Sequence, residues 1–125
     1  MAIERFTKDH EWIRVEDGIG VAGITNYAQG QLGDITFVEL PEIGRKVTQG
    51  DLVCAVDSVK TAAEVFAPVS GEIIETNATL DGHWELVNED AEGKAWFFKL
   101  RIANPAELDK LMDRAAYEAF VKESH

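Results

Sequence analysis

The chain has 125 residues, of which 46% are hydrophobic, and it carries a formal net charge of −11 at pH 7. This length and composition fit one globular domain with a sizeable core and argue against a disordered chain. The strong negative charge disfavours a protein that binds nucleic-acid phosphates, and no apolar run approaches the roughly 20 residues of a membrane span.

The first residues and the cysteine count limit the class of protein further. The start, MAIERFTKDHEW, lacks the basic stretch and the apolar core of a signal peptide. The single cysteine, Cys54, allows neither an internal disulfide nor a CxxC redox pair. We therefore expect a cytoplasmic protein in which any dithiol chemistry depends on a cofactor that supplies the sulfur atoms.

The first two-thirds of the chain is typical of short β-strands separated by turns. Residues 11–15 alternate between polar and apolar, a turn follows at 16–18, and residues 19–24 resume the pattern, which predicts a hairpin. Residues 25–34 predict a short helix that begins at the possible N-cap Thr25 and is broken by glycines. Further strands are predicted at residues 35–40, 52–58, 61–67, 72–76 and 95–101. This succession favours a sandwich or barrel over a parallel sheet.

The tail of the chain changes to helical patterns. Asn104 as N-cap and Pro105 at the first helical position predict a helix over residues 104–112, and residues 113–123 predict a second one. Their apolar stripe either docks a partner or packs onto the β-domain, and the periodicity favours packing. We therefore expect a single domain over residues 1–125 with a C-terminal helical segment at about 104–123.

Three patterns that could carry chemistry have simpler structural explanations. Residues 18–23 match GxGxxG, but the preceding strand alternates and no βαβ unit follows, so we expect a glycine-rich hairpin rather than a dinucleotide site. The histidines match no metal-ligand spacing. His10 and Glu11 either form an acid–base pair beside Trp12 or are solvated residues next to a core tryptophan. Cys54 lies in an apolar run without a neighbouring base, and we expect a buried structural thiol.

A single lysine, Lys60, stands between two small apolar segments. If CAVDS folds back on TAAEV, Val59 and Lys60 form the turn, and Ser58 faces Thr61 across it. Lys60 then projects outward at the apex of the hairpin. A lysine in such a place ordinarily serves solubility, and the hairpin alone does not indicate that it is modified.

The residues around this lysine resemble a known attachment motif. The segment DSVKTAAEVFAPVSGEI, residues 57–73, is similar to the lipoyl-attachment segment of the glycine cleavage system H protein family. The immediate context of Lys60 is formed by Asp57, Ser58, Val59 and Thr61. The segments DHEWIRVEDG, VAGITNYAQGQLGDITFVELPEIG, ELVNED and NPAELDKLMD resemble the same family in the same order, so the resemblance covers residues 6–120. A biotin-carrier motif would place methionine on both sides of the lysine and is disfavoured.

The resemblance implies a flattened lipoyl-type barrel-sandwich hybrid, mainly β, with a short internal helix and C-terminal helices. It implies a carrier that is not an enzyme, with lipoic acid amide-linked to Lys60 by a lipoate-attaching enzyme. The arm would pass the aminomethyl group of glycine from the pyridoxal-phosphate enzyme glycine decarboxylase to the tetrahydrofolate-dependent aminomethyltransferase, and dihydrolipoyl dehydrogenase would reoxidise the dithiol. Because the carried group is an amine, Glu11 and Glu64 are candidates for a carboxylate-lined groove that holds the loaded arm, the alternative being solvated carboxylates.

Some positions depart from the family pattern. Asp57 stands where glutamate is usual, AEGKAW at residues 91–96 replaces a P-Y-G-x-G-W run and leaves the shape of that loop open, and His83-Trp84 replace Asn-Pro or similar. Two alternative functions are a paralogue that relays lipoate to other carriers and a lipoyl domain that serves a 2-oxoacid dehydrogenase. A domain of the latter kind would normally be joined by an Ala/Pro-rich linker, which this sequence lacks.

Overall fold

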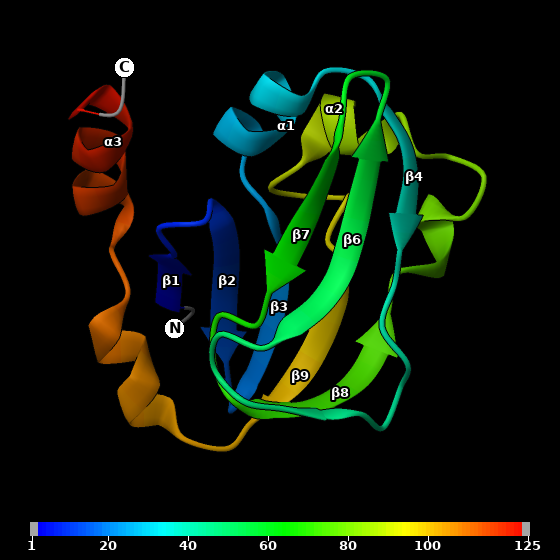
Figure 1. Cartoon of the computed structure of the whole chain (residues 1–125). Helices are drawn as coiled ribbons and strands as arrows, with labels where there is room; N and C mark the ends of the chain where they lie inside the picture. Colours follow the sequence, from blue (N-terminus) through cyan, green and yellow to red (C-terminus); the bar gives the residue numbers. More distant parts are fainter. Residues whose placement is uncertain (1–2, 124–125) are drawn as a thin grey trace.

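The computed structural model describes residues 3–123 as two antiparallel β-sheets that face each other (Figure 1). The larger sheet has the strand order β1-β2-β3-β9-β8-β5, and the smaller sheet has the order β4-β6-β7. The strands are β1 (Ile3–Phe6), β2 (Glu11–Glu16), β3 (Ile19–Ile24), β4 (Ile35–Glu39), β5 (Lys46–Val47), β6 (Leu52–Ser58), β7 (Ala62–Phe66), β8 (Gly71–Thr76) and β9 (Phe98–Ile102). The helical segments are α1 (Asn26–Leu32), η1 (Ala78–Leu80), α2 (Leu86–Asp90), η2 (Pro105–Lys110) and α3 (Arg114–Glu123), where η denotes a 3-10 helix. The mainly β fold with helices inserted and at the C-terminus is the one that the sequence predicts.

The core lies between the inner faces of the two sheets. Val38, Val56 and Val65 come from the smaller sheet, and Ile13 and Leu100 come from the larger one. Each of these side chains is at most 2% exposed. Burial of a side chain of this size contributes about 1.5–3 kcal/mol, so the contact between the sheets holds the smaller sheet, and the turn at its end, in place.

The β2–β3 hairpin confirms the structural explanation of the glycine-rich motif. Its turn residues Asp17 and Gly18 have φ angles of 54° and 78°, and Glu16 pairs with Ile19 across the turn. Two consecutive positive φ angles are required by a two-residue type I′ turn, which glycine and aspartate tolerate best. The residues of the GxGxxG pattern therefore form a turn and an antiparallel strand, which is not the setting of a dinucleotide site.

Several strands and helices differ in position from those that the sequence pattern predicts, or are not predicted by it. The strand predicted at residues 95–101 begins at Phe98 and ends at Ile102. The N–H of Phe97 still donates to the carbonyl of Ala22 at 2.7 Å, but one residue out of step with the regular pairing of Ala22 with Phe98. The strands β1 and β5 and the helix α2 were not predicted, since each is too short to show a period. Within residues 3–123, no helix is long and apolar enough to cross a membrane.

The C-terminal segment differs from the two predicted α-helices. The first predicted helix is a short 3-10 helix, in which the N–H of Leu111 donates to the carbonyl of Leu108 at 3.1 Å. The chain then extends so that Met112 pairs with Phe6 of β1. The helix α3 confirms the second prediction, and it lies beside β1 in Figure 1. Its Tyr117 ring stacks on Phe6 with centroids 4.7 Å apart, so the apolar stripe packs onto the β-domain.

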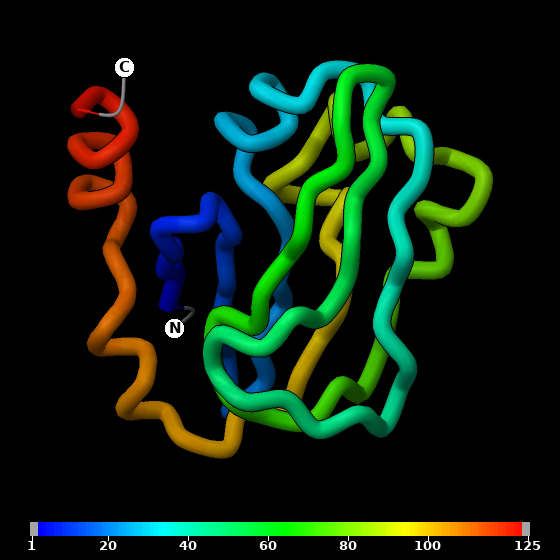
Figure 2. The backbone as a smooth tube through the Cα atoms, in the orientation of Figure 1, coloured from blue at the N-terminus to red at the C-terminus, as the bar shows by residue number. Residues whose placement is uncertain are grey.

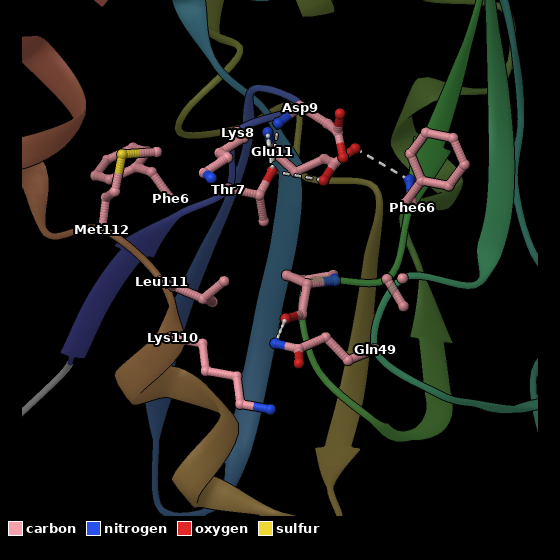
Figure 3. Close-up of a pocket in the computed structure, with 13 residues that line it drawn as sticks. Phe6, Thr7, Lys8, Asp9, Glu11, Gln49, Phe66, Lys110, Leu111 and Met112 are labelled. Atoms are coloured by element: carbon pink, nitrogen blue, oxygen red, sulfur yellow. Dashed lines mark hydrogen bonds between the residues drawn. The ribbon is translucent and has the colours of Figure 1, made fainter. Parts of the chain in front are cut away.

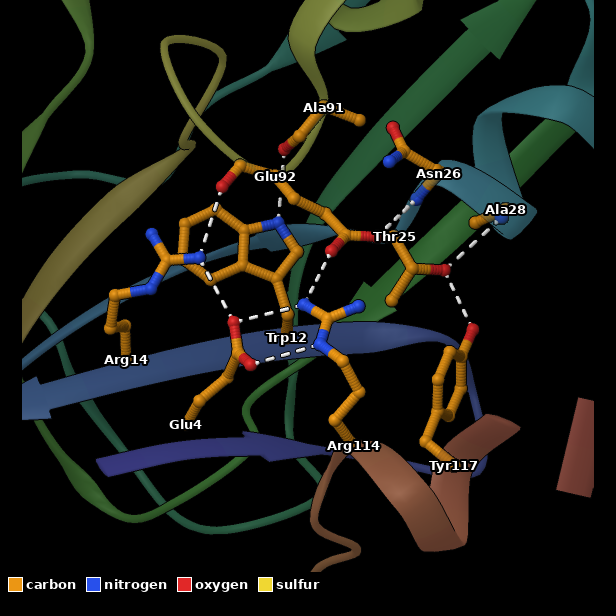
Figure 4. A network of polar contacts seen from close by, with 10 residues as sticks. All are labelled: Glu4, Trp12, Arg14, Thr25, Asn26, Ala28, Ala91, Glu92, Arg114 and Tyr117. Atoms are coloured by element: carbon orange, nitrogen blue, oxygen red, sulfur yellow. Dashed lines mark hydrogen bonds and ion pairs between the residues drawn. The ribbon is translucent and has the colours of Figure 1, made fainter. Parts of the chain in front are cut away.

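The loop at residues 91–95 is held by a network of polar contacts (Figure 4). The carboxylate of Glu92 accepts hydrogen bonds from the N–H of Asn26 at 2.8 Å and from the guanidinium of Arg114 at 3.0 Å. Arg114 also binds the carboxylate of Glu4, and its guanidinium holds the pKa of Glu4 below the usual range. The unusual loop sequence therefore ties α3 to the start of α1.

Candidate functional site

Strands β6 and β7 form a hairpin whose two-residue tip is Val59 and Lys60. The register pairs Asp57 with Ala62, as the sequence predicts, and the N–H of Ser58 donates to the carbonyl of Thr61 at 2.8 Å. The hydroxyl oxygen of Ser58 accepts hydrogen bonds from the N–H groups of Lys60 and Thr61, both at 3.2 Å. Serine at the first turn position thus closes the turn with its own side chain, without the glycine or asparagine that most two-residue hairpins need.

The Lys60 side chain is exposed, and among residues 3–123 it takes part in no ion pair. It extends over Gly33, the C-cap of α1, where an added Cβ would lie 3.1 Å from Lys60 Cε. Gly33 has a φ of 83°, which glycine adopts at little cost. The same glycine therefore ends the helix and leaves space for the lysine stem.

A platform of backbone contacts supports the tip from the side of α1 and β4. The N–H of Val59 donates to the carbonyl of Asp34 at 3.0 Å. Asn88 of α2 lies beneath this connection: its amide donates to the carbonyl of Gly33 at 2.9 Å, and its side-chain oxygen accepts from the N–H of Ile35 at 2.8 Å. Figure 2 shows the hairpin tip beside this connection. Sequence reasoning missed the role of Asn88, because only the fold brings it beneath the connection.

A mainly apolar cavity of about 320 Å³ runs between α1 and the β6–β7 hairpin. Ile24, Leu32 and Val56 contribute apolar surface, and Asp9 and Glu64 also line it. The pairing of Glu64 with Ala55 in the ladder places it on the same face of the smaller sheet as Ala55, and its side chain is exposed. Glu64 is therefore a solvated residue at the edge of the cavity.

Glu11 lines a different cavity, of about 260 Å³, between the β1–β2 connection and the end of β7 (Figure 3). Its carboxylate accepts hydrogen bonds from the hydroxyl of Thr7 at 2.7 Å and from the N–H of Phe66 at 3.0 Å. The residue is only 2% exposed, so the idea of a solvated Glu11 is wrong. Burial raises its pKa to about 7, against the opposing effect of the two hydrogen bonds.

The two candidate carboxylates thus line two neighbouring cavities rather than one groove. Asp9 belongs to the walls of both, which places the cavities next to each other. His10 does not form the acid–base pair considered for it: its Nδ1 lies 2.8 Å from the hydroxyl of Tyr117. Trp12 is fully buried, as expected of a core residue.

Cys54 is the remaining side chain that sequence reasoning singled out. It is 2% exposed and belongs to the core. Burial, helped by the charge of Glu11, raises the pKa of the thiol far above its usual range, so the reactive thiolate is suppressed. This confirms the expected structural role. Among residues 3–123, no three metal-binding side chains cluster.

The structure thus joins two facing antiparallel sheets to a closed hairpin tip, on which the exposed Lys60 stands beside an apolar cavity. The family model described as "Glycine cleavage H-protein" matches residues 4–124. The glycine cleavage system H proteins of Xanthobacter autotrophicus and Rhodospirillum rubrum are 56% and 59% identical to the chain. The first alignment covers 97% of both chains, and the second covers 94% of both. The crystal structure of a glycine cleavage system H protein from Mycobacterium marinum has a TM-score of 0.88 at 31% identity, covering 95% of this chain and 96% of that one.

The chain belongs to the glycine cleavage H-protein family. Proteins of this family are lipoyl carriers of the glycine cleavage system: they hold lipoate covalently on a lysine, work with the other components of the system, and are not catalysts themselves. The alternatives of a lipoate relay and of a 2-oxoacid dehydrogenase domain are not favoured by these relatives.

Proposed function

We propose that Lys60 is the lysine of this chain that carries the lipoyl group. The observation that supports it best is the exposed Nζ at the apex of a hairpin that is closed by Ser58 and braced against the carbonyl of Asp34. An enzyme that acylates a lysine must enclose its amine, and a projecting tip allows this without unfolding the chain. A rigid tip also presents Lys60 in one geometry to every enzyme that visits it.

The surroundings of Lys60 fit the group that it would carry. When bound, lipoate supplies a disulfide that this chain, with one buried cysteine, does not have. The cavity beside the hairpin offers apolar surface from Ile24, Leu32 and Val56 for the hydrocarbon part of such an arm. Gly33 leaves the lysine stem free to lie over α1 towards that cavity.

The partners follow from this proposal. A lipoate-attaching enzyme would modify Lys60. The arm would then serve glycine decarboxylase, the tetrahydrofolate-dependent aminomethyltransferase and dihydrolipoyl dehydrogenase in turn. The cytoplasmic setting expected from the sequence belongs to the same proposal.

The carboxylates near the cavities would hold an amine on the loaded arm. A cationic amine and a carboxylate in a partly desolvated site form charge-assisted hydrogen bonds of about 1.5–3 kcal/mol each. Glu64 would meet the amine at the solvated wall. The buried Glu11 would lose its proton as the amine arrives, because a nearby cation favours the charged form. In this role Glu11 is neutral when the arm is unloaded and negatively charged when the arm carries the amine.

Peptide mapping of the chain from a lipoate-replete host tests the attachment site. We expect the modification on Lys60 alone, and its presence on Lys46 or Lys94 instead would contradict the proposal. Lys60→Arg should abolish carrier activity and leave the fold intact, while Lys94→Arg, at another exposed lysine, should retain activity. Glycine-dependent exchange of carbon dioxide with glycine decarboxylase separates glycine cleavage from lipoate relay, since a relay protein would not support it.

The release of formaldehyde and ammonia from the loaded protein tests the carboxylates. Without the tetrahydrofolate enzyme, Glu11→Gln and Glu64→Gln should leak faster than the wild type, because the amine loses its charged partner. Reoxidation of the unloaded dithiol by dihydrolipoyl dehydrogenase should be unchanged, as no amine is present. Equal leakage from all three proteins would remove both residues from the proposed role.

A further inference from the structure

An aromatic pair of one exposed and one half-buried ring lies beside the carrier hairpin and has no role in the lysine site. Phe37 of β4 is 45% exposed, and its ring meets that of Trp84 with centroids 5.2 Å apart at an angle of 66°. Trp84 packs its inner side against the core. Exposure of a large apolar side chain to water is energetically unfavourable. A cluster of aromatic side chains at the surface marks an interaction site more often than an isolated apolar residue does.

The position of Phe37 relative to the tip is fixed by the strand register. Phe37 pairs with Asp57, the second-to-last residue of β6, and Lys60 stands in the turn that follows this strand. Val59 of the tip is itself 66% exposed. A protein that receives Lys60 in its active site must cover the surface around the tip. Phe37 and Val59 lie within that surface.

Carboxylates surround the aromatic pair. Asp57 and Glu39 are exposed and lie on the same face of the smaller sheet as Phe37, by cross-strand pairing and by alternation along β4. Glu85 is exposed next to Trp84. A second copy of this chain would bring the same carboxylates, and its net charge of −11, against them, so repulsion disfavours self-association. The complementary occupant is an apolar pocket with a rim of lysine or arginine.

We propose that Phe37, supported by Trp84, is an anchor that docks the carrier onto a partner enzyme with an apolar socket and a basic rim. This proposal rests on the proposed function, because a partner enzyme approaches this surface only if Lys60 carries the group on which the enzyme acts. The anchor acts on association, before the arm enters the active site. The anchor therefore determines the affinity of the carrier for the partner enzyme, and it does not take part in the reaction of the lipoyl group.

The test measures binding of a chain that cannot be lipoylated, so that it is independent of the attachment site. Lys60→Arg protein is immobilised, and the dissociation constants of glycine decarboxylase, aminomethyltransferase and dihydrolipoyl dehydrogenase are measured. For the enzyme that binds tightest, adding Phe37→Ala should weaken binding at least tenfold, and Phe37→Leu should weaken it less. Ile43→Ala, which removes another exposed apolar side chain, is the matched control and should change nothing.

Charge gives the second part of the test. Binding of the same enzyme should weaken as salt rises, and Glu85→Lys should weaken it further at low salt, because a basic rim would repel the new lysine. The proposal is overturned if Phe37→Ala changes every dissociation constant by less than twofold. It is also overturned if the substitution instead dissociates a dimer of the chain. If peptide mapping shows that Lys60 is not lipoylated, the proposed function is contradicted, but this binding test remains valid because it uses a chain without the lipoyl group.

Discussion

The buried Glu11 should make the stability of the protein depend on pH near neutrality. Its pKa rises from 4.5 in an exposed setting to about 7 in the folded chain. Below pH 4.5 both states hold the proton. Between these values the unfolded state releases the proton while the folded state keeps it, so the free energy of unfolding falls as pH rises. Above about pH 7 the loss is complete.

The magnitude follows from the size of the shift. Each pH unit corresponds to about 1.4 kcal/mol, so a shift from 4.5 to about 7 gives a loss on the order of 3 kcal/mol by pH 8. Glutamine has the shape of the protonated acid, and its oxygen can still accept from the N–H of Phe66. We therefore expect Glu11→Gln to match the wild type near pH 4.5 and to be about 3 kcal/mol more stable at pH 8.

Urea denaturation at a series of pH values, followed by the fluorescence of the three tryptophans, measures this difference. Glu16→Gln, at the exposed end of the same strand, is the matched control and should track the wild type. If the curves for Glu11→Gln and wild type run parallel from pH 4.5 to 8, the folded protein does not hold a proton on Glu11. The physical reasoning about its burial would then be refuted.

Two single substitutions test the contacts around the hairpin, and one double-mutant cycle tests the ion pair that helps to tie α3 to α1. Gly33→Ala forces a side chain into a positive φ and against Lys60, so urea denaturation should show a loss of about 1–3 kcal/mol. Asn88→Ala leaves the N–H of Ile35 and the carbonyl of Gly33 without their side-chain partner, and hydrogen exchange of residues 33–36 should speed up while other amides keep their protection. A double-mutant cycle of Glu92→Gln and Arg114→Ala should give a coupling of about 0.5–1 kcal/mol that shrinks in high salt, whereas a coupling insensitive to salt would contradict an ion pair.

Local chemistry explains what the sequence could predict. The turn at Asp17 and Gly18, the N-cap Thr25 and the ends of β6 depend on residues within a few positions of one another, and each is found where the pattern placed it. The position of Lys60 at a tip was predictable for the same reason. Adjacent residues determine the local backbone conformation, so that a short motif is enough to predict it.

The rest of the site depends on contacts between distant segments. Asn88 reaches Gly33 and Ile35 across more than fifty residues, and no period in the sequence marks it. The sequence offers Glu11 either as a residue of the groove for the loaded arm or as a solvated carboxylate, and it gives no sign of full burial because carboxylates are rarely buried. Its burial becomes possible only when β7 brings the N–H of Phe66 to it. Met112 follows the same rule, since pairing with Phe6 overrides the helical pattern of its neighbours.

The C-terminal segment also guards the protein against aggregation. Open strand edges are templates on which other chains can add strands. At one side of the larger sheet, β5 is only two residues long and offers little to pair with. At the other side, the backbone of Met112 exchanges two hydrogen bonds with Phe6, the last residue of β1, at 2.8 and 2.9 Å, and so covers one end of what would be an open edge. The bridge thereby shortens the stretch of β1 backbone on which another copy of the chain could add a strand.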